Sequence, residues 1–533
     1  MRQIAIRVST FRHLSSPPFY LAYRLQRAAM STRSYKDAID HLNSLQSNAA
    51  TLDAVRASGG TLSALAIPEM LEYLGRIGYR PEDLNTLNVV HITGTKGKGS
   101  TSAFTDSILR RAKPEWKVGL YTSPHLVAVR ERIRINGRPL PEEDFTRFFF
   151  EVWDRLQDNT VRERESTSLM PGYFRFLTLM AFHTFLALKV DATVLEVGVG
   201  GTYDSTNIVP KPIVTGITAL GIDHVFVLGR TLKEIAWQKG GIYKEGVPAL
   251  TVNQPEEGMT VLKQRAEELK ASEFIATPLV PELANIKLGL AGNHQVQNAT
   301  LAFHLAKAFL RDQASFNDTE GLPESFKVGL EQAKWPGRCQ TVVDPLHTRT
   351  SWYLDGAHTT ESLECCMQWF ISPGVALLSE PAALKPAQRV LILNCTSGRS
   401  GGSFLTSVNA TTNAQLKLYG LGDAGKDLFS HVIFCTNVTY ASGKFKGDLT
   451  AVAIPEADLA ELKTQNQLAE AWFSIHPEFP KENMHVLPSI EHAVEVVRGL
   501  EKNGEGPVDV LVTGSLHLIG GVIEVAGLSD VAL

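Results

Sequence analysis

Short apolar runs alternate with amphipathic segments along most of the chain. Runs with the length and composition of strands occur at 89–93, 117–122, 192–197, 213–218 and 249–252. Apolar residues at three- and four-residue spacing predict helices over 100–111 and 293–310. Strands without a polar face are typical of parallel sheets that helices cover on both sides. The first part of the chain therefore predicts an α/β domain built on a parallel sheet.

The same alternation begins again after the Trp335-Pro336-Gly337-Arg338 turn, which indicates a domain boundary near 335–345. Strands are expected there at 351–354, 389–394, 431–436 and 508–513. We expect a domain over 31–340 and a smaller, Rossmann-like α/β domain over 341–533. Residues 396–430 are rich in Ser, Gly, Thr and Asn, which predicts a long loop or insertion. Before the first strand, 35–74 has a helical pattern with a loop around Gly59 and Gly60.

Composition narrows the class of protein. At 533 residues the chain exceeds the size of a usual single core, which agrees with two domains. The formal net charge of −4 argues against binding to nucleic acid through its phosphates. No apolar stretch approaches the roughly 20 residues of a membrane span. The five cysteines include no metal-type pair, and we interpret them as reduced thiols.

The first thirty residues differ from the rest of the chain. They carry five arginines, and the first acidic residue of the chain is Asp37. This composition is typical of a mitochondrial transit peptide, and Met30 offers a second start. We expect a mitochondrial form, together with a cytosolic one if translation begins at Met30. The alternative is a basic N-terminus without a targeting role.

A glycine-rich segment, GTKGKGST at 94–101, lies directly between the first strand and the first helix. In this position the backbone N–H groups of Gly97, Gly99 and Ser100 can face phosphate oxygens, and Lys98 adds a cation. The spacing differs from the G-x-x-x-x-G-K-[ST] pattern, because a glycine separates Lys98 from Ser100. For the octet alone, a glycine turn with a chance lysine is the competing interpretation. The segment predicts a variant nucleotide-binding loop.

Three other polar residues also follow predicted strands. Glu196 ends an apolar strand, where a buried carboxylate needs a cation or metal as partner. Ser123 and His224 lie beyond the ends of two further strands, on the edge where open parallel sheets bind ligands. An oxygen-rich site with one histidine suits Mg²⁺. Taken singly, Ser123 also fits a turn and His224 a surface group.

Eight blocks in order resemble the Mur ligase superfamily and, more closely, folylpolyglutamate synthases of the eukaryotic mitochondrial and cytosolic type. They are HITGTKGKGST, YTSPHL, LEVGVGGTYDSTN, GIDHV, KGGIYK, WPGR, DGAHT and TGSLHLIGG, and they span most of residues 35–521. The resemblance implies that the 31–340 domain is a phosphate-loop ATPase domain and that the 341–533 domain takes part in glutamate ligation. It implies ATP and one or two Mg²⁺ ions as cofactors, and it leaves room for a monovalent cation.

The resemblance also assigns roles to single residues. It gives Ser123, Glu196 and His224 to Mg²⁺. It implies that Lys239, at the start of KGGIYK, is carboxylated and helps to hold a second Mg²⁺, although Gly240 stands where the family usually has alanine. A surface lysine paired with Glu234 is the alternative for Lys239, and Lys244 is a second candidate for the modification.

The resemblance implies that Arg338 and Asp355, across the expected cleft, contact ATP, and that Asn298 contacts it near the phosphates. An arginine on a hinge can reach a phosphate that is being transferred only when the domains close. A salt bridge within the linker is the competing role for Arg338. His358 in DGAHT is a candidate for the site of the incoming glutamate.

The implied reaction is ligation of L-glutamate to the terminal γ-carboxylate of a reduced folate through an acyl phosphate. Reduced folate and glutamate are then the partners of a monomeric enzyme. Dihydrofolate synthase activity on dihydropteroate is the nearest alternative, and an ATP-binding regulator without ligase activity is the alternative from another class. The aromatic residues of 173–182 and 148–150 are candidates for a pterin slot, or for helix core.

Overall fold

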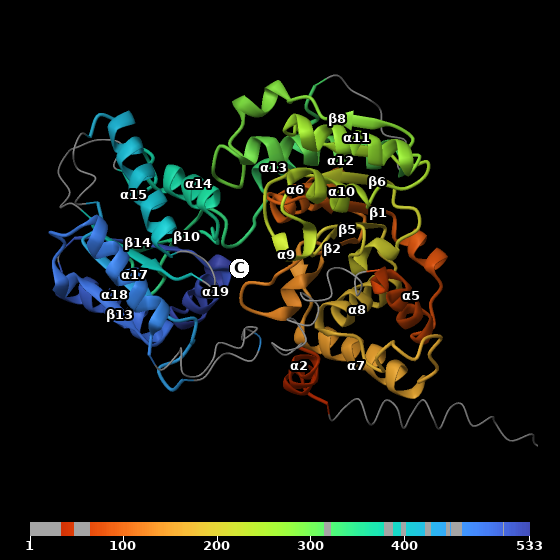
Figure 1. Ribbon diagram of the computed structural model, residues 1–533, viewed down its shortest axis with the longest axis horizontal. Helices are drawn as coiled ribbons and strands as arrows, with labels where there is room; N and C mark the ends of the chain where they lie inside the picture. Colours follow the sequence, from red (N-terminus) through yellow and green to blue (C-terminus); the bar gives the residue numbers. More distant parts are fainter. Residues whose placement is uncertain are drawn as a thin grey trace, which may run out of the picture.

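The computed structural model describes residues 33–46, 64–313, 321–377, 387–395, 401–421, 428–443, 448, 461–504 and 506–533. Figure 1 shows two α/β halves side by side, with the N-terminal half in red to green and the C-terminal half in blue-green to blue. Each half contains one sheet. The basic segment 1–30, the expected loop at Gly59 and Gly60, and residues 396–400 and 422–427 of the expected insertion lie outside the described residues.

The first sheet has eight strands in the order β4-β3-β2-β5-β1-β6-β7-β8. The strands are β1 Val89–Thr93, β2 Val118–Tyr121, β3 Ile133–Ile135, β4 Arg138–Pro139, β5 Ala192–Glu196, β6 Val214–Ile217, β7 Ala249–Thr251 and β8 Phe274–Ala276. The strands from β2 to β8 along this order pair in parallel, and they include all five strands predicted in this half.

One edge of this sheet corrects the expectation of a parallel sheet. β2 pairs antiparallel with β3, and β3 pairs antiparallel with β4. The reason is local, since Asn136 and Gly137 join β3 to β4 with backbone φ angles of 50° and 78°. An Asn-Gly pair with positive φ at both positions favours a two-residue hairpin turn. The sheet is therefore mixed, and a hairpin forms its edge.

Helices cover both faces of the first sheet (Figure 1). They are α2 Tyr35–Ser44, α5 Ala66–Arg76, α6 Lys98–Ala112, α7 Glu142–Asp158, α8 Tyr173–Leu188, α9 Val225–Leu228, α10 Leu232–Gly240, α11 Glu256–Glu268, α12 Gln295–Gln313 and α13 Glu324–Glu331. Alternate residues of β1 show the division, because Val90 and Ile92 pack with α6, α12 and α13 whereas Val89 packs with α5, α7 and α8. This arrangement buries all five residues of β1, including His91 and Thr93, as expected for a strand inside a parallel sheet.

The second sheet has the order β13-β12-β11-β14-β10-β9. Its strands are β9 Gln340–Val343, β10 Thr350–Leu354, β11 Gln388–Leu393, β12 His431–Cys435, β13 Met484–Leu487 and β14 Val508–Thr513. Only the edge strand β9 pairs antiparallel among these described strands. The helices of this half are α14 Thr360–Phe370, α15 Gly401–Leu418, α17 Lys463–Ile475, α18 Ile490–Asn503, α19 Leu516–Val525 and α20 Ser529–Ala532.

Helix α15 corrects the prediction of a long loop over 396–430. Ser, Thr, Asn and Gly disfavour helix, but Phe404, Leu405, Val408 and Leu416 recur on one side of this segment and are buried. They pack in the same core as residues of α14 and α17. Tertiary burial of an apolar stripe outweighs weak intrinsic propensity, which explains why composition alone gave the wrong element.

Candidate functional site

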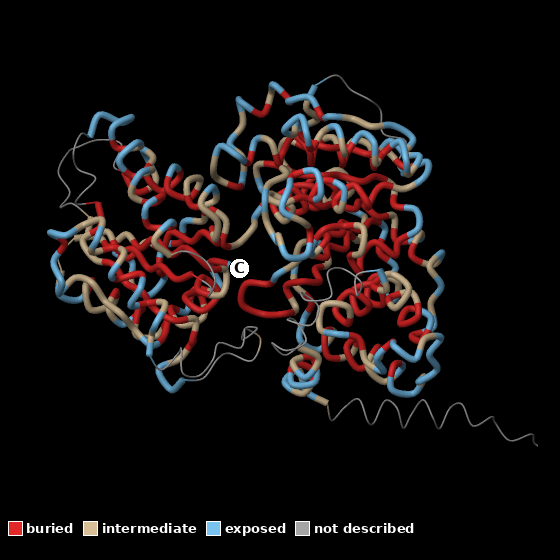
Figure 2. The backbone as a smooth tube through the Cα atoms, in the orientation of Figure 1, coloured by how far each residue is buried: buried red, intermediate tan, exposed pale blue. Residues whose placement is uncertain are grey.

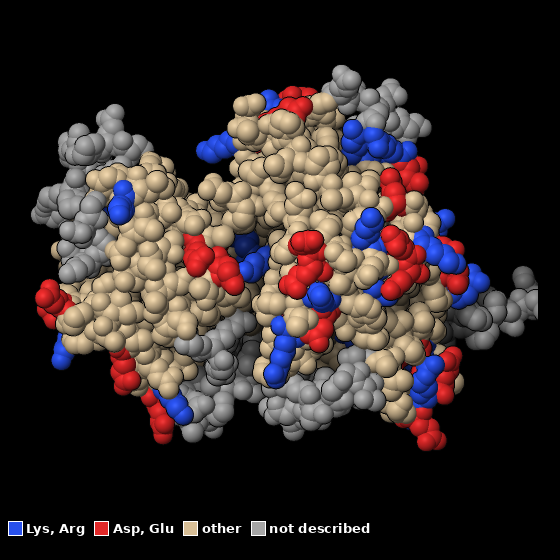
Figure 3. Space-filling view, turned by 45° about the horizontal axis from the view of Figure 1, so that its top comes forward, with Lys and Arg blue, Asp and Glu red and all other residues tan. Residues whose placement is uncertain are grey.

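The parallel strands β1, β2 and β5 of the first sheet have their carboxyl ends at the same level. The predicted site residues lie along this common edge. Ile92 is paired with Glu196, and Tyr121 with Leu195, so β1, β2 and β5 reach the edge at the same level. The glycine-rich loop follows β1, Glu196 ends β5, and Ser123 follows β2. Figure 3 shows a hollow between the two halves of the molecule with basic side chains inside it. The edge of a parallel sheet thus faces a second domain across a hollow.

The glycine-rich loop forms the turn that a phosphate site requires. Gly97 is the N-cap of α6 with a φ of 89°, and no side chain caps this helix. The first N–H groups of an α-helix have no partner within the helix, and the helix dipole favours an anion there. Gly97, Lys98, Gly99 and Ser100 therefore present a free helix N-terminus, and the structure supports the predicted interpretation of this loop.

The glycines of the loop also make room for neighbouring side chains. A Cβ atom added at Gly97 would lie 2.1 Å from Asn298 Oδ1, and one at Gly99 would lie 2.8 Å from Trp335 Nε1. Asn298 in turn donates from Nδ2 to Gln295 Oε1 at 2.9 Å. The structure therefore brings Asn298, a predicted ATP contact on α12, against the phosphate loop.

Replacing Gly97 by alanine is expected to lower the affinity for MgATP at least about tenfold. The new Cβ would collide with Asn298, and the positive φ would strain an L-residue, at a cost on the order of 1–3 kcal/mol. Isothermal titration calorimetry with a non-hydrolysable ATP analogue measures this change. Gly75→Ala is the matched control, because nothing lies within 4 Å of a Cβ at Gly75 in α5. Equal affinity in Gly97→Ala and Gly75→Ala would contradict the expectation.

Two lysines meet at one carbonyl group of the loop. Lys98 Nζ donates to Gly94 O at 3.0 Å, and Lys239 Nζ, from the end of α10, donates to the same oxygen at 2.7 Å. Lys239 is buried. Burial, reinforced by the positive charge of Lys98, holds the pKa of Lys239 well below its usual range. The alternative of a surface lysine paired with Glu234 is therefore wrong, since Glu234 instead accepts hydrogen bonds from Thr231.

Glu196 lies within this group of charges. Ser123 N donates to Glu196 Oε2 at 3.2 Å, which ties the ends of β2 and β5 together. Burial raises the pKa of Glu196 to about 7, and the positive charges of Lys98 and Arg338 oppose that rise. A buried carboxylate with a raised pKa is a group that a bound cation would return to its ionised form.

His224 lies on the turn that begins α9. Its backbone is left-handed, its side chain is half exposed, and its Nε2 lies 3.8 Å from Asp223 Oδ2. Within the described residues no group of three or more His, Cys, Asp or Glu side chains lies close enough to hold a metal ion. The assignment of His224 to Mg²⁺ stays a prediction.

The segment joining the two halves carries Arg338 and leads to Asp355. Asp355 accepts hydrogen bonds from Cys339 N at 2.7 Å and from Ala357 N at 2.9 Å, so it fixes the hinge to the end of β10. Arg338 Nη1 donates to Gly337 O at 3.0 Å, not to a linker carboxylate. His358 Nδ1 lies 2.9 Å from Gly356 O.

Sequence reasoning missed a contact between the halves at the phosphate loop. Lys96 Nζ lies 2.9 Å from Glu361 Oε2, which belongs to the first turn of α14. Lys96 lies within the block HITGTKGKGST, and Glu361 lies just after the block DGAHT. The loop contains two lysines, Lys96 and Lys98, and only Lys98 is predicted to contact phosphate. The second lysine was therefore the one feature of the sequence that could have indicated another partner.

The aromatic candidates for a pterin slot are mostly core residues. Phe148, Phe149, Phe150, Phe176 and Phe182 are buried in the cluster that packs α7 and α8 against the sheet. Of the first residues of α8, Tyr173 and Phe174 are only partly buried. The proposed slot at 148–150 is therefore wrong, because α7 turns its aromatic face to the core.

The fold is known from solved structures. Mycobacterium tuberculosis folylpolyglutamate synthase complexed with ADP and AMPPCP matches 86% of this chain and 95% of its own, with a TM-score of 0.64 and 21% identity. E. coli FolC in complex with DHPP and ADP matches 87% of this chain and 93% of its own, with a TM-score of 0.59 and 23% identity. No protein-family model matches the chain. Fold and site together define a two-domain α/β protein with a phosphate-type loop at the end of its first strand.

Sequence comparison gives the family. Folylpolyglutamate synthase of Saccharomyces cerevisiae strain FostersO is 43% identical over 514 residues, which cover 94% of this chain and 88% of the yeast protein. The protein of strain S288c matches to the same extent. The chain belongs to the folylpolyglutamate synthase family.

Proposed function

We propose that the protein uses ATP to join L-glutamate to the terminal γ-carboxylate of a reduced folate and so builds poly-γ-glutamate tails. The observation that carries the proposal is the meeting of Lys98, Lys239 and Glu196 at one sheet edge, beside the hinge that holds Arg338. The 43% identity to a yeast folylpolyglutamate synthase over nearly the whole chain supports the substrates.

Two steps account for the ligation. A γ-carboxylate oxygen of the folate attacks the γ-phosphorus of ATP, so that ADP leaves and an acyl phosphate forms. The amine of glutamate then attacks the acyl carbon, phosphate leaves and the amine gives up a proton. ATP activates the acid, so the chain needs no nucleophile of its own. Positioning and charge stabilisation are the tasks left to the protein.

The residues of the site fit those tasks. Lys98 places an ammonium group at the helix N-terminus where phosphate oxygens would lie, and Arg338 adds a second cation from the hinge. The C-terminal half would exclude water from this site when the two halves close, and water would otherwise hydrolyse an acyl phosphate. Asn298 and Asp355 are the further residues proposed for ATP, and His358 is proposed for glutamate.

Magnesium fits part of the predicted set. Glu196 and Ser123 would hold the ion, because a buried carboxylate and a hydroxyl group suit a hard cation and because Glu196 is otherwise costly to ionise. His224, at the start of α9, is proposed as a further ligand of the ion. Bound Mg²⁺ supplies charge neutralisation on the nucleotide phosphates.

We also propose that Lys239 is carboxylated. Only an uncharged amine adds to CO₂, and burial lowers the pKa of Lys239 and so favours that form. The amine nitrogen bonds to the carbon of CO₂ and loses a proton. The wild-type protein in ¹³C-bicarbonate is expected to show a carbamate resonance that Lys239→Met lacks. A resonance that persists in Lys239→Met but disappears in Lys244→Met would assign the modification to Lys244.

The deciding assay is ADP release by the purified protein with MgATP, tetrahydrofolate and glutamate, with dihydropteroate in a parallel reaction. We expect tetrahydrofolate products that grow by whole glutamate units in a mass spectrum. Product from dihydropteroate alone would make the protein a dihydrofolate synthase. ATP turnover that does not depend on glutamate would exclude ligation.

The basic N-terminal segment supports a proposal on location. We propose a mitochondrial form that loses about residues 1–30 and a cytosolic form that starts at Met30, both as monomers. N-terminal sequencing of protein from separated organelles tests the first part, and an intact Met1 in mitochondria would contradict it. Light scattering during size-exclusion chromatography measures the molar mass and so tests whether the protein is a monomer. No described helix combines the length and apolar character needed to cross a membrane.

A further inference from the structure

The loop after β2, residues 123–128, connects the two halves of the molecule beside the hinge, where Leu126 packs against Gly337. In Figure 1 it is the orange loop that extends towards α19, and Figure 2 shows most of it as buried. It leaves the sheet at Ser123 and carries Leu126 and Val127 into the core of the C-terminal half. There they belong to the same cluster as Trp352 and Ile519, and they are 6% and 2% exposed. The loop is part of both halves.

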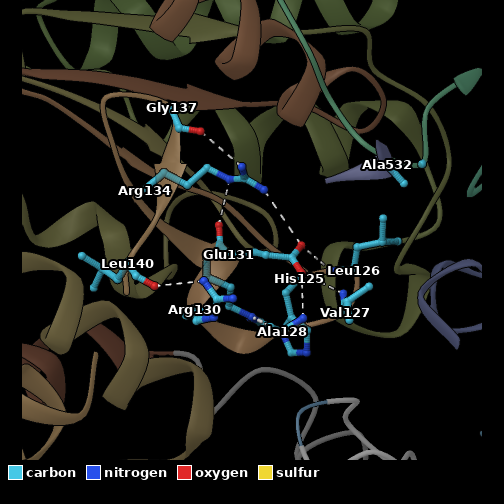
Figure 4. Close-up of polar contacts among 12 residues, drawn as sticks. His125, Leu126, Val127, Ala128, Arg130, Glu131, Arg134, Gly137, Leu140 and Ala532 are labelled. Carbon is cyan, nitrogen blue, oxygen red and sulfur yellow. Dashed lines mark hydrogen bonds and ion pairs between the residues drawn. The ribbon is translucent and has the colours of Figure 1, made fainter. Parts of the chain in front are cut away.

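The carboxylate of Glu131 holds the backbone of this loop. Glu131 Oε1 accepts hydrogen bonds from Val127 N at 2.9 Å and Ala128 N at 2.7 Å, and Oε2 accepts one from Leu126 N at 3.1 Å (Figure 4). Glu131 itself is buried. Hydrogen bonds to an ionised acceptor are stronger than neutral ones, and three of them fix three successive peptide groups. The path of the loop into the other half therefore depends on one side chain.

Arg134 extends this contact to the hinge. Arg134 Nε donates to Glu131 O at 3.1 Å, and Nη2 lies 3.9 Å from Glu131 Oε2 (Figure 4). Its guanidinium lies 5.4 Å from the ring centre of Trp335, the first residue of the hinge turn. Trp335 Nε1 lies 2.8 Å from the position of a Cβ at Gly99 in the phosphate loop. A continuous set of contacts thus joins the loop, the hinge and the nucleotide site.

We propose that Glu131 is a positioning residue for the ligase reaction. With Arg134 it forms a joint that sets the orientation of the C-terminal half, and so places Arg338 and Asp355 opposite the phosphate loop. A buried carboxylate with only a structural role would affect unfolding and leave turnover by folded molecules unchanged. The inference rests on the proposed nucleotide site, and it needs no assumption about the metal ligands.

Glu131→Gln tests the joint with little change of volume. Its amide nitrogen is a donor, so it must face at least one of the three backbone donors, and the loop loses one or two of its bonds. We expect kcat for folate- and glutamate-dependent ADP release to fall between about 10- and 100-fold, as for a displacement near 1 Å. The KM for MgATP should change less than about threefold, because the phosphate loop is intact. Glu131→Asp keeps the charge and should recover part of kcat.

Small-angle X-ray scattering gives a second readout that does not depend on turnover. Glu131→Gln is expected to have a larger radius of gyration than the wild-type protein, because the halves are held less firmly. Glu143→Gln, on the exposed side of α7, should match the wild-type protein in both measurements. A folded Glu131→Gln variant with wild-type kcat and scattering would overturn the proposal.

A further variant covers the case in which Glu131→Gln does not fold. Arg134→Met leaves the three bonds of Glu131 in place and removes the contact with Trp335, so kcat should fall in the same direction. Wild-type kcat in Arg134→Met would overturn the proposal. If the wild-type protein shows no folate-dependent ADP release, the proposed function fails, whereas the scattering comparison still tests the joint.

Discussion

Replacing Lys98 by alanine is expected to lower folate- and glutamate-dependent ADP release about 10³-fold. The ammonium of Lys98 lies 3.0 Å from Gly94 O at the start of α6, where the γ-phosphate of ATP would gather negative charge during transfer. A preorganised cation there stabilises the transition state more than it stabilises bound ATP. Most of the loss should therefore be in kcat. Steady-state kinetics with a coupled ADP assay measure it. The circular dichroism spectrum should not change.

Lys96→Ala is the matched control, since it removes the same charge from the same loop. The ammonium of Lys96 lies against Glu361 of the other half and is partly exposed, so its loss should lower ADP release less than about tenfold. An equal loss in both variants would mean that the net charge of the loop, and not the position of Lys98, is what matters. More than a tenth of wild-type turnover in Lys98→Ala would contradict the assignment of Lys98.

Glu196→Gln is expected to lower folate- and glutamate-dependent ADP release about 10³-fold without lowering the unfolding midpoint. The amide keeps the shape and an acceptor for Ser123 N, but it cannot give a metal ion the charge of a carboxylate. Burial raises the pKa of Glu196 to about 7, above its unfolded value. In metal-free buffer the folded state therefore loses stability as the pH rises from the unfolded pKa of Glu196, 4.5, to its folded pKa of about 7. At pH 8 the unfolding midpoint of Glu196→Gln should equal or exceed that of the wild-type protein.

A buried carboxylate away from the site provides the comparison. Glu72 accepts hydrogen bonds from Glu163 N at 2.8 Å and Thr167 Oγ1 at 2.9 Å. Glu72→Gln should weaken these bonds and lower the unfolding midpoint while leaving kcat within about twofold. Wild-type activity in Glu196→Gln would remove Glu196 from the metal site. Reduced stability in Glu196→Gln would show that its role is structural.

The parts of the fold that the sequence predicts are those set by local pattern. The buried strands 89–93 and 192–197 are short and mostly apolar, and the structure places them at β1 and β5 almost without change. Parallel strands end at one edge, so the neighbourhood of Gly97, Ser123 and Glu196 also follows from the sequence. The Asn136-Gly137 hairpin carries an equally local signal, because this residue pair favours a two-residue turn.

The parts that the sequence could not predict depend on contacts between distant residues. Lys96 and Glu361 lie 265 positions apart, and nothing near either residue indicates the other. Leu126 reads as an ordinary apolar loop residue until the second core is known. Helix α15 forms in spite of its composition because α14 and α17 offer it an apolar surface. The exposed turn of His224 is likewise a matter of tertiary placement.

The insertion of Leu126 and Val127 into the second core bears on how the protein can be divided. Although the hinge separates the two sheets along the chain, a fragment of residues 341–533 would have a hole where these two side chains pack. The loss of two buried apolar side chains costs on the order of 2–5 kcal/mol each, a large part of the stability of a domain this size. We therefore expect the C-terminal half to be less stable alone than in the whole chain. During synthesis it completes its core only around a loop of the half that the ribosome made first.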